Sequence, residues 1–263
     1  MRTIYVIGIG AGNPEFVTVQ AIKALNRIDV FFFMDKGEAK QDLVLLRKEI
    51  CDRYIEDRSY RIVETADPVR DPEIADYKTR VEAWHRQRAL LYEQMIAGEL
   101  EEDQCGAFLV WGDPSLYDST LRIIDQITAR RQVDFELRVI PGITSIQALA
   151  ASHRISLNGL GESVVITTGR RLSSGSAPEG DNTVVMLDAQ CSFKTRMNAD
   201  LEIYWGAYLG MEDEVLLSGK LDEIAAEIEA VRAQSRLRHG WIMDTYLLAK
   251  SPLSVEDGKG HSK

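Results

Sequence analysis

The sequence predicts an α/β fold with two layered domains. Three observations support this: short apolar runs of strand length recur, segments with helically spaced apolar residues follow most of them, and glycine turns end several of the runs. With 263 residues, 45% of them hydrophobic, the chain is long enough for two modest domains. We expect a first domain over residues 1–120, a second over 121–250 and a polar tail over 251–263.

The first half of the chain is predicted to alternate strands and helices. Thr3 to Ile9 is an apolar run that ends in glycines, and Thr18 opens a segment with helical spacing, so we expect a strand, a turn and a helix. Val30 to Met34 is continuously apolar, which indicates a strand buried on both faces. Further along, we expect helices at residues 42–51, 74–100, 119–130 and 143–151, and strands at 61–64, 106–111 and 135–140. A loop is expected at 66–72.

The second half is expected to repeat this alternation. Apolar runs predict strands at 163–168, 183–187 and 202–208, a helix at 221–232 and a last strand near 241–247. The segment 173–181 is rich in Ser, Gly and Pro, so it is predicted to be a loop.

Charge and cysteine content argue against several classes of protein. A net charge of −10 weighs against a general nucleic-acid or membrane-surface binder, because proteins that bind those partners present an excess of Lys and Arg over the binding face. The three cysteines, Cys51, Cys105 and Cys191, lie far apart and form no CxxC pair, so neither a disulfide framework nor a zinc site is expected. The chain shows no signal-peptide pattern and no run of the roughly 18 apolar residues of a membrane span, so a cytoplasmic location is expected.

A glycine-rich turn, Gly8-Ile9-Gly10-Ala11-Gly12, follows the first strand. Glycines there allow a tight turn and close approach to a ligand, which by itself suggests a dinucleotide fold, with Asp35 at the second strand end as a ribose acceptor. However, Asn13 replaces the third glycine of that fingerprint, and Pro14 stands where the helix should have begun. A dinucleotide-binding module and a plain tight turn both remain alternatives.

Two further turns follow apolar strands. Gly112-Asp113-Pro114 alone is a common turn sequence, because Asp satisfies backbone donors and Pro presets φ. Pro141-Gly142-Ile143-Thr144-Ser145 ends a later strand. Ligands of parallel sheets bind beyond the carboxyl ends of the strands, so the three turns are predicted to converge on one small molecule.

Together, the segments Ile7 to Pro14, Gly112 to Pro114 and Val139 to Ser145 resemble the tetrapyrrole (corrin/porphyrin) methylase family. The resemblance runs from residue 3 to about residue 248, and Thr167-Thr168-Gly169 is similar to a further strand-end motif of the family. It implies two α/β domains with a cofactor cleft between them and, as is usual in the family, a homodimer. Longer blocks, at residues 84–86, 108–120 and 204–210, resemble the member that methylates C-1 of precorrin-5 and releases acetate during cobalamin synthesis.

The resemblance also implies S-adenosylmethionine as cofactor, leaving as S-adenosylhomocysteine and held largely by main-chain groups. The residues that it assigns to cofactor contacts are Ala11, Trp111, Gly112, Asp113, Leu116, Thr144, Ser145, Leu187 and Leu209. Ala11 stands where many members have proline, and Arg170-Arg171 where others often have histidine. Methyl transfer from a sulfonium needs alignment more than a metal, and the sequence shows no metal-ligand spacing.

Acetate loss would require water to attack the acetyl carbonyl, with a general base and oxyanion stabilisation. Asp35 is the candidate base; capping of the loop after its strand is the alternative role. Because the substrate bears many carboxylates, basic side chains are expected near it. For each basic candidate, the alternative is a solvent-exposed charge without a substrate role. The substrate candidates are Lys36, Tyr117, Arg122, Arg170 and Arg171, and the four histidines, His85, His153, His239 and His261, are assigned no role.

The principal alternative within the family is methylation at a different ring carbon, or of RNA or a protein. The net charge weighs against RNA. From a different class, a dinucleotide-binding module using residues 8–12 remains the rival hypothesis.

Overall fold

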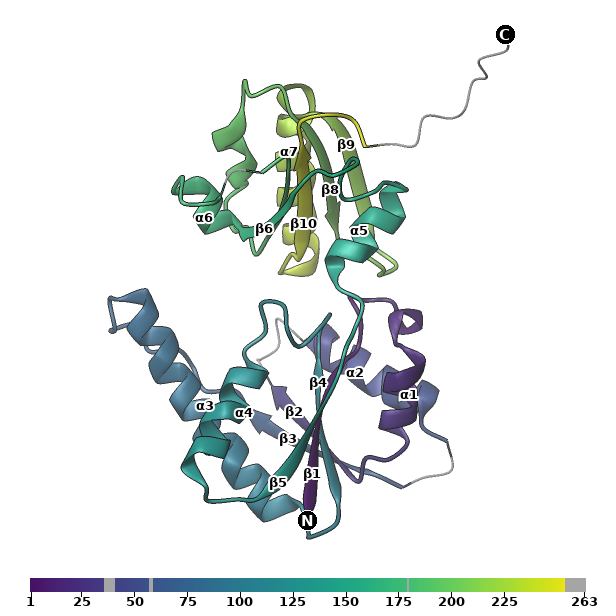
Figure 1. The fold of residues 1–263 in the computed structure, drawn as a ribbon, viewed down its shortest axis with the longest axis vertical. Helices are drawn as coiled ribbons and strands as arrows, with labels where there is room; N and C mark the ends of the chain where they lie inside the picture. The colour runs from purple at the N-terminus through teal and green to yellow at the C-terminus, as the bar shows by residue number, and fades with distance from the viewer. Residues whose placement is uncertain (36–40, 57–58, 179, 254–263) are drawn as a thin grey trace. The chain divides into compact units, whose positions relative to one another are not determined.

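The computed structural model describes residues 1–35, 41–56, 59–178 and 180–253 (Figure 1). The chain divides into two compact units, Met1–Thr144 and Ser145–Lys263. This division lies later than the boundary expected near residue 120, because β5 (Phe135–Ile140) pairs with β1 (Arg2–Gly8) in the sheet of the first unit. From residue 254 onward, the expected polar tail lies outside the described residues.

The first unit contains a five-stranded sheet in the order β3-β2-β4-β1-β5. Its other strands are β2 (Val30–Asp35), β3 (Arg61–Ala66) and β4 (Cys105–Val110). Every neighbouring pair is parallel, so all five carboxyl ends lie at one edge of the sheet. Because parallel strands bind ligands beyond their carboxyl ends, this edge is where a site is expected.

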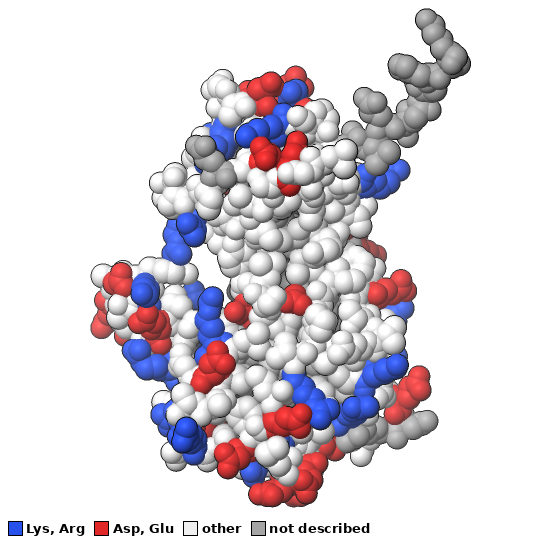
Figure 2. Space-filling view, in the orientation of Figure 1, with Lys and Arg blue, Asp and Glu red and all other residues white. Residues whose placement is uncertain are grey.

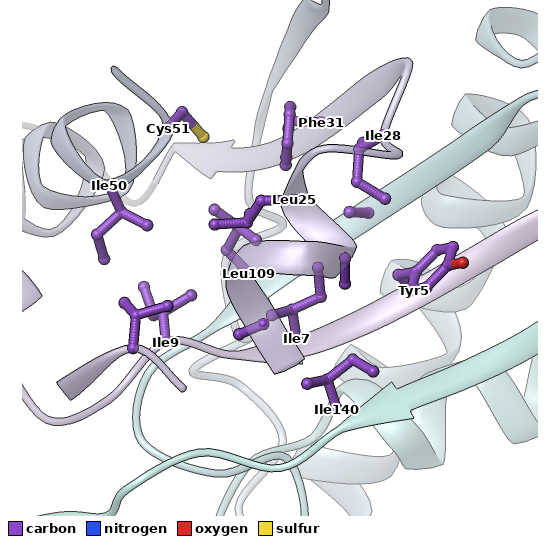
Figure 3. Packing of buried hydrophobic residues seen from close by; sticks show 14 of the residues in the cluster. Tyr5, Ile7, Ile9, Leu25, Ile28, Phe31, Ile50, Cys51, Leu109 and Ile140 are labelled. Carbon is purple, nitrogen blue, oxygen red and sulfur yellow. The ribbon is translucent and has the colours of Figure 1, made fainter. Parts of the chain in front are cut away.

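Helices cover both faces of this sheet (Figure 1). On one face, α1 (Val19–Leu25) and α2 (Gln41–Tyr54) enclose the core of Figure 3, where Leu25 and Ile50 pack with Ile7 of β1. On the other, α3 (Tyr77–Glu99) and α4 (Thr120–Arg130) form a second core, in which the rings of Tyr92 and Phe108 stack at 4.4 Å. The layered arrangement confirms the α/β prediction for this unit.

The second unit contains a five-stranded sheet in the order β6-β7-β10-β8-β9. Only β6 (Val164–Thr168) and β7 (Asn182–Met186) are parallel, whereas the pairings of β8 (Glu202–Ala207), β9 (Val215–Lys220) and β10 (Asp244–Ala249) are antiparallel. The second sheet is therefore mixed, unlike the parallel sheet of the first unit. β9 was not predicted, because its apolar run covers only the three residues 215–217.

Helices also pack on the second sheet. α5 (Ser145–His153) contacts β8 and β10, and a Cβ on Gly206 would lie 2.9 Å from Leu149 of this helix. α7 (Leu221–His239) and α6 (Gly169–Ser173) contribute to the core around Trp205. Two 3-10 helices, Pro14–Phe16 and Ser192–Arg196, complete the elements named here.

A buried polar network fixes the centre of this second sheet. Arg232 of α7 donates from Nε to Asp244 Oδ2 at 2.9 Å and from a terminal nitrogen to the Asp188 carbonyl at 2.6 Å. Trp205 Nε1 donates to the same Asp244 oxygen at 3.1 Å, and the Tyr246 hydroxyl donates to Asp188 at 2.8 Å. All five side chains are buried, and both carboxylates accept hydrogen bonds within the unit, which offsets part of the cost of burying them.

The surface shows no large area of one charge on the face in Figure 2, where acidic and basic side chains are intermixed over the first unit. Among the described residues, no helix is long and apolar enough to cross a membrane, and no group of His, Cys, Asp and Glu is arranged to hold a metal ion. The three cysteines are free thiols, and burial raises the pKa of Cys51 to about 12.

Candidate functional site

Three glycine turns lie against one another at the carboxyl edge of the first sheet. The Gly112 N–H donates to the Gly10 carbonyl at 2.8 Å, which joins the turns after β4 and β1. A Cβ on Gly142 would lie 2.1 Å from the Gly112 carbonyl oxygen and 2.9 Å from Gly8 Cα. The turns meet at one place, because only residues without side chains allow three backbones to approach this closely. That they converge on one small molecule stays a prediction.

Asp113 fastens two of these turns together. Its Oδ2 accepts the Gly142 N–H at 2.8 Å, while Oδ1 accepts the backbone N–H of Ser115 at 2.8 Å and also the Ser115 hydroxyl. Burial opposes the charge, but the hydrogen bonds from Ser115 and Gly142 outweigh it and lower the pKa of Asp113. The carboxylate is therefore ionised at neutral pH and holds the loop in one conformation.

Replacing this carboxylate should loosen the loop. In Asp113→Ala the Gly142 N–H loses its acceptor, and we expect the free energy of unfolding of the first unit to fall by about 1–3 kcal/mol. Because the pKa of Asp113 is lowered by folding, its contribution is present above the unfolded value near pH 4 and disappears as pH falls through the lowered value. Urea unfolding at pH 7 and at acidic pH, compared with the exposed Asp125→Ala as control, measures this; equal effects at both pH values would contradict it.

The other predicted residues of the first unit lie around these turns. Ala11 and Thr144 are buried, whereas Trp111 and Leu116 are half-buried. Tyr117 is exposed and has a φ of +52°, a left-handed conformation that is uncommon for a large side chain and concentrates at functional sites. Arg122 is exposed on the first turn of α4.

The remaining predicted residues belong to the second unit. Ser145 begins α5, and its hydroxyl lies 2.9 Å from that of Thr245 in β10. Leu187 follows β7, is 65% exposed and has a φ of +53°, while Leu209 is buried, so mainly its backbone is available to a ligand. Arg170 and Arg171 are exposed on α6, where Arg171 donates to the Ser176 carbonyl at 2.9 Å.

Asp35 is exposed at the end of β2, where its carbonyl accepts the Asp67 N–H at 2.8 Å. Lys36 lies outside the described residues. The dinucleotide hypothesis loses its structural basis, because a 3-10 helix follows Gly12 and α1 begins only at Val19. No α-helix N-terminus directly follows the glycine turn, where a pyrophosphate would bind.

A polar cluster at the same sheet edge was not predicted. His85 of α3 lies with Nε2 at 2.9 Å from the Ser119 hydroxyl, at the start of α4. One turn further along α3, Arg88 lies 2.9 Å from Asp67, which follows β3, and donates to the Tyr92 hydroxyl at 2.7 Å. The sequence offers no spacing signal for this cluster, because helix packing brings together residues that are 34 positions apart.

Positive charge surrounds His85. The guanidinium groups of Arg70 and Arg88 lie 4.4 and 4.6 Å from the ring centre of Trp84, whose Nε1 donates to the Pro68 carbonyl at 2.7 Å. Burial lowers the pKa of His85, and Arg122, Arg88 and Arg70 lower it further, while Asp118 acts in the opposite direction. His85 is therefore a neutral imidazole at neutral pH and can accept a proton.

Comparison with known proteins agrees with these features. The model of the family described as Tetrapyrrole (Corrin/Porphyrin) Methylases matches residues 3–225. A precorrin-6A synthase (deacetylating) of Sinorhizobium sp is 52% identical over 250 residues, which cover 95% of this chain and 96% of that protein. A probable cobalt-precorrin-2 C(20)-methyltransferase of Methanocaldococcus jannaschii is 26% identical, with coverage of 85% and 90%.

Solved structures resemble this fold as well. The crystal structure of a putative cobalamin synthesis related protein (CobF) from Corynebacterium diphtheriae superposes with a TM-score of 0.82 at 43% identity, covering 95% of this chain and 99% of that one. The fold is also that of a uroporphyrin-III C-methyl transferase from Thermus thermophilus complexed with S-adenyl homocysteine, with a TM-score of 0.56, 17% identity and coverage of 94% and 92%. With its motif turns, its fold and these matches, the chain belongs to the tetrapyrrole (corrin/porphyrin) methylase family.

Proposed function

We propose that this chain is an S-adenosylmethionine-dependent C-methyltransferase of cobalamin biosynthesis, which methylates C-1 of precorrin-5 and releases acetate to give precorrin-6A. The observation that supports this most is the 52% identity to a precorrin-6A synthase (deacetylating), which extends over 95% of this chain. The glycine turns and the Asp113 clamp are consistent with it, because they form a rigid backbone surface at the ligand-binding edge of a parallel sheet.

The residues around the glycine turns fit a cofactor held by main-chain groups. The Gly8, Gly112 and Gly142 backbones leave no room for a Cβ at positions 8 and 142, and such preordered N–H and carbonyl groups bind without loss of side-chain entropy. Within the first unit, Ala11, Trp111, Gly112, Asp113, Leu116 and Thr144 would contact S-adenosylmethionine. The second unit would contribute Ser145, Leu187 and Leu209.

When bound, the cofactor supplies an electrophilic methyl group on a sulfonium. The protein then has to align the ring carbon with that methyl and exclude water, and such alignment contributes on the order of 7–11 kcal/mol to lowering the barrier. Asp113 keeps the loop in a fixed conformation for this purpose.

Basic side chains would receive the substrate carboxylates. Arg122 lies on the first turn of α4, five residues after Tyr117 in the sequence, and Arg170 and Arg171 lie on α6. Arginine suits this role because its planar guanidinium pairs bidentately with a carboxylate. Lys36 retains the role predicted from the sequence.

The test is incubation with precorrin-5 and S-adenosylmethionine. We expect one equivalent each of acetate and S-adenosylhomocysteine, and a product whose mass reflects the exchange of an acetyl for a methyl group. A product that gains a methyl without loss of acetate would reject the deacetylating reaction. Calorimetry adds a control: S-adenosylhomocysteine should bind, whereas NAD should not. The homodimer and the cytoplasmic location remain predictions.

A further inference from the structure

The proposed reaction includes a step that the cofactor loop cannot perform, the cleavage of the carbon–carbon bond that joins the acetyl group to C-1. Cleavage requires a nucleophile on the acetyl carbonyl, a base for its proton and stabilisation of the oxyanion. The His85–Ser119 pair and the charges around it supply these three elements at the carboxyl edge of the first sheet. We propose that Ser119 accepts the acetyl group of the substrate and that His85 is its general base. This inference rests on the proposed function.

The first support is the geometry of the pair. His85 Nε2 lies 2.9 Å from Ser119 Oγ, within the range for proton transfer between a base and a nucleophile. Ser119 precedes α4, but its side chain makes no capping hydrogen bond to that helix. Asp118 instead accepts the Thr120 N–H at 2.6 Å. The Ser119 hydroxyl is thus directed at His85 and not at the helix backbone.

The second support is electrostatic. His85 is 7% exposed. The charged groups that act on it are Arg88 on its own helix, Arg70 from the loop after β3, Arg122 on α4, and Asp118, the residue before Ser119. The net positive surroundings favour a neutral imidazole before the reaction and stabilise an oxyanion during it. The N-terminus of α4 adds to that stabilisation, because helix N-termini favour negative charge.

The third support is position. Ser119 follows Leu116 of the predicted cofactor loop by three residues, a distance of at most about 11 Å along the chain. The acetyl acceptor and the loop that would hold the methyl donor can therefore serve the same ring carbon. Asp35, the base predicted from the sequence, ends β2, and its role as a base stays a prediction.

Ser119 Oγ bonds to the acetyl carbon while its proton passes to His85 Nε2, and the carbonyl electron pair moves onto oxygen. When the carbonyl re-forms, the bond between the acetyl carbon and C-1 breaks, and its electron pair remains on C-1, where the methyl transfer consumes it. His85 releases its proton to solvent. His85 then takes a proton from water as the water attacks the acetyl ester. It returns this proton to Ser119 Oγ as acetic acid leaves, and the acetic acid then ionises.

The experiment compares Ser119→Ala and His85→Gln with the wild-type chain. We expect each variant to release acetate at least about 100-fold more slowly, while the affinity for S-adenosylhomocysteine stays within about 2-fold. The matched controls are Ser235→Ala in α7 and His153→Gln, a half-buried histidine of the second unit that bonds to the Trp205 carbonyl; both should react like the wild type. Acetate release at the wild-type rate in Ser119→Ala would overturn the proposal.

Two further measurements do not depend on an inactive variant. In the wild-type chain, added hydroxylamine should divert part of the acetate to acetohydroxamate, because it attacks the acetyl ester; acetate without any hydroxamate would mean direct attack by water and would overturn the role of Ser119. Acetate release should also decline as pH falls through the lowered pKa of His85, and Arg122→Gln should move this decline to higher pH. If the wild-type chain releases no acetate from precorrin-5, the proposed function itself fails.

Discussion

Gly142→Ala should weaken cofactor binding and destabilise the first unit by about 3 kcal/mol, at the upper end of the usual cost of overpacking. The added Cβ would lie 2.1 Å from the Gly112 carbonyl oxygen and 2.9 Å from Gly8 Cα, so backbone atoms and not flexible side chains would have to move. Such movement also breaks the bond from the Gly142 N–H to Asp113. Calorimetric titration with S-adenosylhomocysteine and urea unfolding measure the two effects, and we expect the affinity to fall at least about 10-fold.

Gly98→Ala is the matched control. Gly98 lies in α3 of the same unit, and a Cβ there meets nothing within 4 Å, so alanine should stabilise the helix by about 0.5–1 kcal/mol. Gly112→Ala should lie between the two, because its Cβ has room at 3.7 Å from Thr144, but its φ of +67° is unfavourable for alanine. A Gly142→Ala variant as stable as Gly98→Ala would show that the three turns do not touch.

Arg232→Met should destabilise the second unit by about 3–5 kcal/mol, the usual cost of removing one partner of a buried ion pair. The substitution keeps most of the side-chain volume but leaves Asp244 buried without its cationic partner, although the Trp205 N–H still donates to it. It also deprives the Asp188 carbonyl of a hydrogen bond. Faster hydrogen–deuterium exchange in peptides from β8 and β10 would report this loss within the second unit.

Arg236→Met provides the control for that measurement. Arg236 occupies the next turn of α7 and is exposed, so its loss should change stability by no more than about 0.5 kcal/mol. Exchange rates in the first unit should be unchanged in both variants. Equal protection of β10 in Arg232→Met and Arg236→Met would contradict a stabilising role for the buried pair.

Much of the first unit could be predicted from the sequence, because its strands β1, β2 and β4 are mostly apolar and largely buried. Val30–Asp35 is buried over four successive residues, and such a run stands out in any sequence. The domain boundary could not be predicted, because the return of β5 to the side of β1 is a pairing between residues more than 130 positions apart. The alternating half-exposed residues of β9 were similarly weak as a signal.

The candidate site also has one part that the sequence predicts and one part that it does not. Glycine turns at strand ends are local features, so the convergence of Gly8, Gly112 and Gly142 followed from the sequence and from the geometry of parallel sheets. The contact between His85 and Ser119 depends on how α3 packs against α4, and residue types alone contain no information about that packing.

The place of β10 in its sheet has a consequence for synthesis on the ribosome. Residues 244–249 form the middle strand, between β7 and β8, and contribute Asp244 and Tyr246 to the buried network. All strands of the first sheet, in contrast, lie within the first 140 residues. Chains emerge N-terminus first at about 5–20 residues per second. The first unit can therefore complete its sheet several seconds before the second receives the strand that joins its two halves, and during that interval the nascent second unit exposes unpaired strand edges.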